Sequence, residues 1–391
     1  MTKYIAFIGF IVSTCLMAAC SSSDMPIQHA DDYGYITFSA QTEKVTSRTN
    51  PYEDYSSSKH PATMGVFGYH DLSLQNGSST ANTIFDNEKT TYNATSSNWE
   101  TENKKKWHEN STAKTFDFFA YMPKLAEAHV ATADNTANIT SGSTCSYTLT
   151  IPFSMPTGSC YLTDTQQAPI ICALPDHKQA TSADGTELAF ERVVKLKFDQ
   201  TLTAYQLHFM LDSKMGAIRQ FRIKGVTLSG TIATSGTISR TYTWDSANNE
   251  WTAGSIQWQN IQRTSDTDAP ISIPNGNNTS SSDEAEGATT ESLLVTSSGY
   301  TQWGGNLYMI PDAEFQPTIS VTYDVEMLAE DGTTIITRKD VTSSIILNKN
   351  NFSSLTAGGI AMINPIRILI QPRYLYVMAD DDAYTGHLLI E

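Results

Sequence analysis

Short runs in which apolar and polar residues alternate are the feature of this sequence that most constrains its fold. The clearest run places apolar side chains at every second position: Ile319, Val321, Tyr323 and Val325. Such period-two spacing is typical of a β-strand with one buried face. Asp331-Gly332 follows and predicts a hairpin turn into a strand over 333–338. Because similar runs recur and helical periodicity is almost absent, the sequence predicts an all-β protein.

The chain has 391 residues, enough for two domains with substantial cores. A polar gap at 175–186 precedes a new series of strand-like runs that begins near Val194. We therefore predict two β-sandwich domains, residues 33–190 and residues 191–391, and expect the second to fold alone. Residues 253–290 are rich in Ser, Asn, Asp and Gly and predict a long surface loop. Residues 124–131 are the one candidate for a short helix.

The N-terminus carries the pattern of a lipoprotein signal peptide. Lys3 precedes an apolar run that is too short to span a bilayer, and Ala18 and Ala19 then lead into Cys20. This pattern predicts cleavage between Ala19 and Cys20, removal of residues 1–19 and acylation of the Cys20 thiol. Residues 20–32 would then be a polar tether. The alternative is an ordinary secretory signal with a chance cysteine.

The charge and the cysteines limit which partners and which disulfides the mature chain can have. The net charge of −16 argues against a nucleic-acid partner. No second segment is long and apolar enough to cross a membrane. Cys145, Cys160 and Cys172 remain after processing, and they allow either a Cys145–Cys160 disulfide or three small buried side chains.

The motifs of common catalytic and metal sites are absent from the sequence. The eight histidines show no metal-ligand spacing, and there is no Gly-x-Ser-x-Gly, phosphate loop or dinucleotide fingerprint. The six tryptophans would stack on sugars only if exposed, and core positions are the commoner use. We therefore expect no catalytic residue, no metal and no cofactor, and the sequence indicates a protein that is not an enzyme.

Several short segments resemble one known family. They are Ile36-Thr37-Phe38-Ser39-Ala40 with Ser47-Arg48-Thr49, Trp107 with Phe116-Asp117-Phe118-Phe119-Ala120-Tyr121-Met122-Pro123, 198–209, Leu307-Tyr308-Met309-Ile310-Pro311 and Leu355-Thr356-Ala357-Gly358-Gly359. In this order they are similar to segments of the Bacteroidales fimbrillin-like (Mfa-like) pilus subunit family. Gln200 stands where that family usually has His.

The resemblance implies two tandem transthyretin-like β-sandwich domains and export as a surface-exposed lipoprotein of the cell outer membrane. It also implies assembly into a fimbria. In that family a protease cuts after an arginine between the first and second strands, which places maturation between Arg48 and Thr49. Lys44 is a competing basic residue in the same polar connection. Loss of the first strand opens a groove that a strand of another subunit fills.

The incoming strand must be detachable and must alternate apolar residues. The tail 372–391, beyond the break at Pro372, supplies two candidate pieces. The candidate donor residues are Tyr374, Leu375, Tyr376, Val377, Met378, Leu388, Leu389 and Ile390. The alternative is that the tail folds back as the last hairpin of its own domain.

These observations favour a structural or adhesive subunit of a surface pilus. A polymerising shaft subunit is preferred to an anchor or tip subunit, because both Arg48 and a candidate donor tail are present. The expected partners are other pilus subunits, a surface receptor or glycan, and the outer membrane through lipid before processing. Two rival functions are a glycan-binding lipoprotein that stays anchored and a secreted hydrolase on a β-scaffold.

The lipoprotein hypothesis makes a direct prediction for Cys20. Because only the cysteine thiol accepts the lipid, Cys20→Ser should abolish acylation and leave uncleaved or soluble precursor. Metabolic labelling with a fatty acid, followed by membrane fractionation, measures this. A Cys15→Ser variant is the matched control and should be labelled normally. Normal labelling of Cys20→Ser would refute the assignment.

Overall fold

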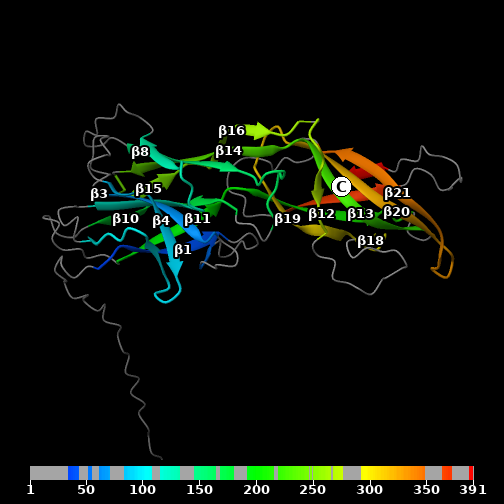
Figure 1. Ribbon diagram of the computed structural model, residues 1–391, viewed down its shortest axis with the longest axis horizontal. Coiled ribbons are helices and arrows are strands. Elements are labelled where there is room, and N and C mark those ends of the chain that lie inside the picture. The colour runs from blue at the N-terminus through cyan, green and yellow to red at the C-terminus, as the bar shows by residue number, and fades with distance from the viewer. Residues whose placement is uncertain are drawn as a thin grey trace, which may run out of the picture.

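The computed structural model describes most of the chain beyond residue 33. The described residues are 34–43, 52–54, 61–70, 83–107, 115–132, 145–163, 168–179, 192–214, 219–245, 247–248, 250–265, 267–275, 292–347, 363–371 and 387–390. All the elements within them are β-strands, so the prediction of an all-β protein is confirmed. Within these ranges, no helix has the length and apolar character of a membrane span. Figure 1 shows an elongated molecule in which two β-sheet bodies lie end to end.

Two sheets form what we call the N-terminal body. The first contains β1 (Thr37–Glu43), β2 (Tyr52–Asp54), β3 (Thr63–His70), β4 (Thr83–Asn93), β5 (Asn98–Thr101), β6 (Thr115–Met122), β9 (Ile170–Cys172), β10 (Asp176–Gln179) and β11 (Val193–Gln200). The second contains β7 (His129–Thr132), β8 (Cys145–Ser154), β14 (Ala233–Asp245), β15 (Glu250–Ala253) and β16 (Gln257–Arg263). The first sheet runs β10-β6-β3-β4-β5-β1-β11-β9. Because β9 also pairs with β6, it curls back on itself as a partial barrel.

Strand β6 joins the two sheets of this body through one core. All eight of its residues are buried, as expected of a strand covered on both faces. On one face the Phe119 ring lies 5.4 Å from the ring of Tyr242 in β14 and 5.6 Å from that of Trp251 in β15. On the other face the Phe118 ring lies 5.8 Å from that of Phe38 in β1. The continuous aromatic run of β6 therefore reflects two packed faces.

Two further sheets form the C-terminal body. One contains β12 (Thr203–Leu211), β19 (Thr301–Met309), β22 (Ile363–Gln371) and β23 (His387–Ile390). The other contains β13 (Arg219–Thr231), β17 (Ile271–Ile273), β18 (Leu293–Val295), β20 (Gln316–Leu328) and β21 (Thr334–Ile346). Burial along β20 alternates as its sequence predicts. The hairpin at Asp331-Gly332 is confirmed: Ala329 N donates to Thr333 O at 2.7 Å, and Gly332 takes a φ of 84°.

The two bodies do not divide at residue 190, where the sequence analysis put the boundary. Strand β11 lies beyond that point, yet it pairs with β1 and β9 in the N-terminal body. The chain then enters the C-terminal body at β12 and β13, returns with β14, β15 and β16, and crosses again at β17. Apolar alternation locates strands but does not reveal which sheet each strand joins. Residues 191–391 are therefore not a separate unit of this fold.

Two local expectations are also corrected. Strands β15, β16 and β17 occupy much of 250–275, where the sequence predicted a loop from residue 253, and Trp258 and Ile273 are buried there. The strands are polar because one face is exposed. Residues 276–291 of the predicted loop lie outside the described residues. No helix forms at 124–131: a turn leads directly into β7.

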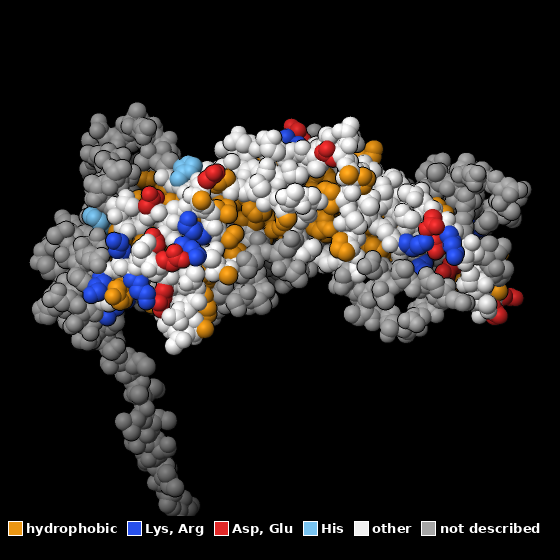
Figure 2. Space-filling view, in the orientation of Figure 1, with side chains coloured by type: hydrophobic (Ala, Val, Ile, Leu, Met, Phe, Trp, Pro, Cys, Tyr) orange, Lys and Arg blue, Asp and Glu red, His pale blue; other side chains and the backbone are white. Residues whose placement is uncertain are grey.

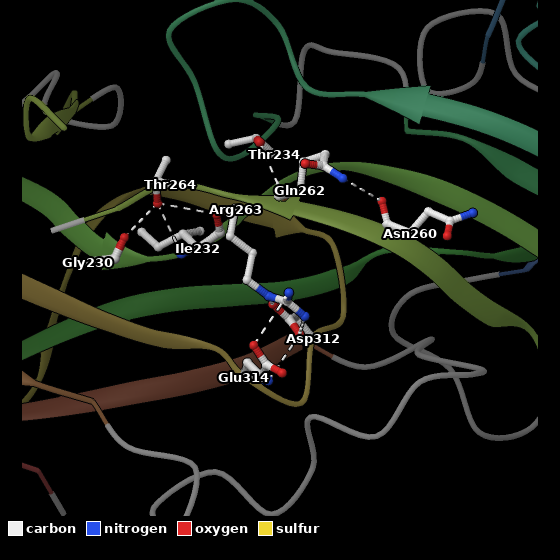
Figure 3. A network of polar contacts seen from close by, with 9 residues as sticks. All are labelled: Gly230, Ile232, Thr234, Asn260, Gln262, Arg263, Thr264, Asp312 and Glu314. Carbon is white, nitrogen blue, oxygen red and sulfur yellow. Dashed lines mark hydrogen bonds and ion pairs between the residues drawn. The ribbon is translucent and has the colours of Figure 1, made fainter. Parts of the chain in front are cut away.

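An ion pair with a buried carboxylate ties the two bodies together where β16 ends (Figure 3). The Arg263 guanidinium donates from Nε to Asp312 Oδ2 at 2.6 Å and from Nη2 to Oδ1 at 2.8 Å. The Asp312 side chain, just after β19, is only 1% exposed. Next to this pair, Thr264 Oγ1 donates to Gly230 O at 2.6 Å, from one body to the other. Bidentate contacts of this kind fix orientation as well as distance.

We call the Arg263–Asp312 ion pair the clamp. We expect its loss to lower the free energy of unfolding more than the loss of an exposed ion pair. Arg263→Ala leaves a buried carboxylate unpaired; because Arg263 is itself partly exposed, we expect a loss of about 2–3 kcal/mol in the free energy of unfolding. The control is Lys224→Ala, because Lys224 pairs at 2.6 Å with the 67% exposed Asp340. It should cost less than about 1 kcal/mol. Equal losses in urea unfolding would contradict the clamp.

Candidate functional site

The candidate site is the position of β1 within the N-terminal body. Six residues of β1 pair in parallel with β11, from Thr37 opposite Val193 to Thr42 opposite Phe198. On its other side β1 pairs with β5. Its inward side chains are Ile36, Phe38, Ala40 and Thr42, which are 0–6% exposed. The strand that follows the predicted tether is therefore an internal strand of the sheet and fills the core.

Aromatic rings line the slot in which β1 lies. The Phe38 ring has the ring of Phe85 at 6.0 Å and that of Phe118 at 5.8 Å, both in edge-to-face contact. The start of the strand is held by backbone hydrogen bonds, with Ile36 N donating to Lys105 O at 2.8 Å. Trp107 N likewise donates to Gly34 O at 3.2 Å. Removal of β1 would therefore expose an apolar slot and a row of backbone groups on β11.

The predicted maturation site lies between β1 and β2 in the chain. These two strands pair antiparallel, with Glu43 opposite Tyr52, so residues 44–51 connect them. Arg48, Thr49 and the competing Lys44 fall in this connection, outside the described residues. Cys20 and Ala19 also lie outside them. Cleavage after Arg48 stays a prediction.

The end of the candidate donor tail lies against its own chain. Leu388, Leu389 and Ile390 belong to β23, which pairs antiparallel with β22. This is the fold-back arrangement that the sequence analysis left as an alternative for the tail. Within the described strands, β23 is the edge of its sheet and is paired through His387–Ile390. The other donor candidates, Tyr374, Leu375, Tyr376, Val377 and Met378, lie outside the described residues.

The aromatic and sulfur side chains have structural roles. All six tryptophans are buried, which confirms their core assignment: Trp99, Trp107, Trp244, Trp251, Trp258 and Trp303. Cys160 is a free thiol, so the Cys145–Cys160 disulfide is not formed. Burial raises the pKa of the Cys160 thiol to about 12, which keeps it protonated and unreactive at neutral pH. Cys172 is also free and buried.

An Asp–His pair in the same core connects several strands. Asp117 Oδ1 lies 2.7 Å from His177 Nδ1 and accepts from Trp251 Nε1 at 2.7 Å. The His177 ring lies 4.5 Å from that of Trp244. These contacts join β6, β10, β14 and β15, so the pair holds the two sheets together. No group of three or more metal-ligating side chains occurs in the part of the chain that the structure describes.

The acceptor strand β11 is the part of this site that the sequence analysis missed. Its buried residues, Val194, Leu196 and Phe198, were recognised as a strand but assigned to the second domain. The sequence showed the alternation of these residues. It did not show which strand β11 pairs with, because the parallel partner β1 lies about 150 residues earlier in the chain.

Because the Phe38 ring fills the slot, we expect Phe38 to contribute most of the stability that β1 provides. Phe38→Ala removes a fully buried ring held by aromatic neighbours, so we expect a loss of about 3–5 kcal/mol. The control is Tyr35→Ala, because Tyr35 is close in the chain but 49% exposed. It should cost less than about 1 kcal/mol. Thermal and urea unfolding of both variants measure the difference, and similar losses would show that β1 is not a core strand.

No protein-family profile and no curated protein matches the chain. Among solved structures it is similar to a fimbrial protein from Bacteroides vulgatus, at 16% identity and a TM-score of 0.48, over 92% of this chain and 99% of that one. It is also similar to a candidate cell adhesion protein from Bacteroides ovatus, at 14% identity and a TM-score of 0.39, over 92% and 96%. A candidate cell adhesion protein from Bacteroides uniformis follows, at 11% identity and a TM-score of 0.36, over 92% and 97%.

These structures are Bacteroides fimbrial and candidate cell adhesion proteins, which is the class that the sequence resemblance named. All their TM-scores are below 0.5, so the functional proposal below rests on the residues and geometry of this chain.

Proposed function

We propose that this protein is a structural and adhesive subunit of a surface fimbria and not an enzyme. It is exported as an outer membrane lipoprotein with two transthyretin-like bodies and is assembled by strand exchange. One observation carries this proposal: β1, the first described strand, is an internal core strand, and the chain continues from it to the other described strands through the connection to β2. That connection contains Arg48.

The order of Cys20, β1 and Arg48 along the chain links release of the subunit from the membrane to opening of its slot. The lipid on Cys20 and strand β1 both precede Arg48. A cut after Arg48 leaves β1 on the lipid-bearing fragment, held by noncovalent contacts alone. Departure of this fragment would free the subunit from the membrane and open its slot in the same event.

The energetics favour replacement of β1 by another strand. Loss of Ile36 and Phe38 from the core costs about 1.5–3 kcal/mol for each side chain. It also leaves the edge of β11 unpaired over six residues. An incoming strand with the same alternation would restore the apolar contacts and the ladder hydrogen bonds.

The tail is the proposed donor. Strand β23 pairs through a short segment at the edge of its sheet, so its release breaks few backbone contacts. Its apolar residues, Leu388, Leu389 and Ile390, would then be available to a neighbouring subunit together with the segment 374–378. The exchange replaces the weakly held β23–β22 pair with an internal position next to β11, which provides the driving force.

A glycan-binding lipoprotein that stays anchored is the rival function, and the N-terminus distinguishes the two. An anchored protein keeps the lipid on Cys20 and keeps β1. A fimbrial subunit begins at Thr49 after maturation. N-terminal sequencing and lipid analysis of the protein from intact cells decide between them.

Two variants test strand exchange together. Arg48→Ala should keep the subunit lipid-bound and monomeric, because β1 cannot leave. Truncation after Gln371 should permit normal cleavage but remove the donor. Lys44→Ala is the matched control and should be processed and assembled normally. Electron microscopy and shear release of fibres measure assembly. Fibres of ordinary length from both test variants would refute exchange through these segments.

A further inference from the structure

A trough runs along the N-terminal body where β8 ends and β14 begins. Two hollows, of about 570 and 800 Å³, share Ser154 and Ser235 in their linings, so they adjoin one another, and we call them together the trough. One end is bounded by Leu125 and Glu127 and the other by Asp268 and Ser272. Figure 2 shows hydrophobic side chains gathering in the middle of the visible face, between the two bodies. The volumes are in the range of small-molecule sites.

The backbone under the trough is irregular. The pairing of β14 with β16 shifts register between Ala233 and Ser235, and again between Ser235 and Thr237. Asn260, in β16, takes a φ of 52°, a left-handed conformation that non-glycine residues seldom adopt. Bulges and such conformations cluster where a strand must redirect a side chain, often at binding sites.

Gly236 lines the trough and packs closely against β16. A Cβ atom at this position would lie 3.1 Å from the Trp258 ring and 3.2 Å from the carbonyl oxygen of Gln259. A side chain here would therefore displace the wall of the core. Glycine at this position allows β14 and β16 to pack closely beside the hollow.

The lining combines two aromatic residues, Phe153 in one hollow and Tyr161 in the other, with many neutral polar groups. Phe153 is half-buried and packs edge-on against Trp258, with 6.1 Å between ring centroids. Ser154, Ser235 and Thr237 line the same hollow. Figure 3 shows the amide end of Asn260 pointing away from the neighbouring Gln262 and Arg263.

The charges select the class of ligand. Neither hollow has a Lys, Arg or His in its lining, and each has a carboxylate, Glu127 in one and Asp268 in the other. This disfavours phosphates, uronic acids and other anions. Hydroxyl, amide and carboxylate groups around an apolar surface match a neutral sugar, whose hydroxyls form hydrogen bonds while its C–H face packs on an aromatic ring.

A peptide strand fits the same place less well. Strand β7 pairs with β8 only from Thr150 back to Tyr147, so the segment beyond it has no partner on that side among the described strands. Pro152 lies in that segment and has no N–H to donate. A peptide added there would form an interrupted ladder.

We infer that this trough binds a neutral oligosaccharide, by packing on Phe153 and by hydrogen bonds to Asn260 and to polar groups of the other lining residues. The inference deepens the adhesive part of the proposed function and rests on it for its biological setting. It does not depend on cleavage or strand exchange. Failure of sugar binding therefore leaves fimbrial assembly untouched, and failure of assembly leaves the trough intact.

The test uses the full chain without its signal peptide and two variants of the trough. Ser154→Trp fills the depression from an exposed position shared by both hollows. Asn260→Gly removes the amide and keeps the left-handed backbone, which glycine adopts without strain. The matched controls are Ser344→Trp, on an exposed position of β21, and Ser97→Gly, at another left-handed residue with a φ of 56°.

The probes are the hexasaccharides of cellulose, xylan, mannan, laminarin and amylose, with hexagalacturonate as the acidic control. Binding is measured by isothermal titration calorimetry. At least one neutral probe should bind, with affinity at least tenfold weaker in Ser154→Trp and about three- to tenfold weaker in Asn260→Gly. Both control variants should bind as the unsubstituted protein does.

Three results would overturn the inference. They are no binding of any neutral hexasaccharide, equal binding by Ser154→Trp and Ser344→Trp, and preferential binding of hexagalacturonate. Displacement of a bound sugar by an unstructured peptide of tighter affinity would assign the trough to peptides instead. Circular dichroism of each variant verifies that its fold is retained.

Discussion

The parallel pairing of β1 with β11 is the interaction on which the N-terminal body depends. It joins the first described strand to a strand about 150 residues later and places β1 between β5 and β11. Strand β9 then links β11 to β6, and the sheet returns on itself. Without β1 this ring opens between β5 and β11, and Phe38 is lost from the aromatic cluster with Phe85 and Phe118.

The same pairing explains why the two bodies are interleaved. Because β11 belongs to the N-terminal body, the chain must cross to reach β12, and it crosses again to supply β14, β15 and β16. Arg263 and Asp312 fix the junction with a bidentate contact. In the proposed assembly this arrangement has a consequence. The acceptor slot lies in the N-terminal body, whereas β23, the described part of the proposed donor tail, lies in the C-terminal body (Figure 1). Contacts between two different surfaces build an open chain of subunits when the rotation from one subunit to the next does not close a ring.

Assembly and the inferred sugar site use different parts of the molecule. The slot lies in the first sheet, at β1, whereas the trough lies over β8, β14 and β16 in the second. A subunit whose slot is filled by a neighbour would therefore still present its trough. The buried tryptophans take no part in ligand contact. They stabilise the cores, and Trp258 packs against Phe153 and next to Gly236, two residues that line the trough.

The sequence by itself determined the strands, their buried faces and several turns. Alternation identified β20, the hairpin at Asp331-Gly332 and the core position of Phe38, because burial of one face imposes a period of two on any strand. Tertiary structure decided which strands became neighbours. The assignment of β11 to β1, the return of β14 to the N-terminal body and the contact of Arg263 with Asp312 all join residues far apart in the chain. The trough beside Gly236 is likewise lined by residues that are far apart in the chain. Such contacts depend on complementary shape across sheets, and a strand carries the same alternation whichever partner it meets.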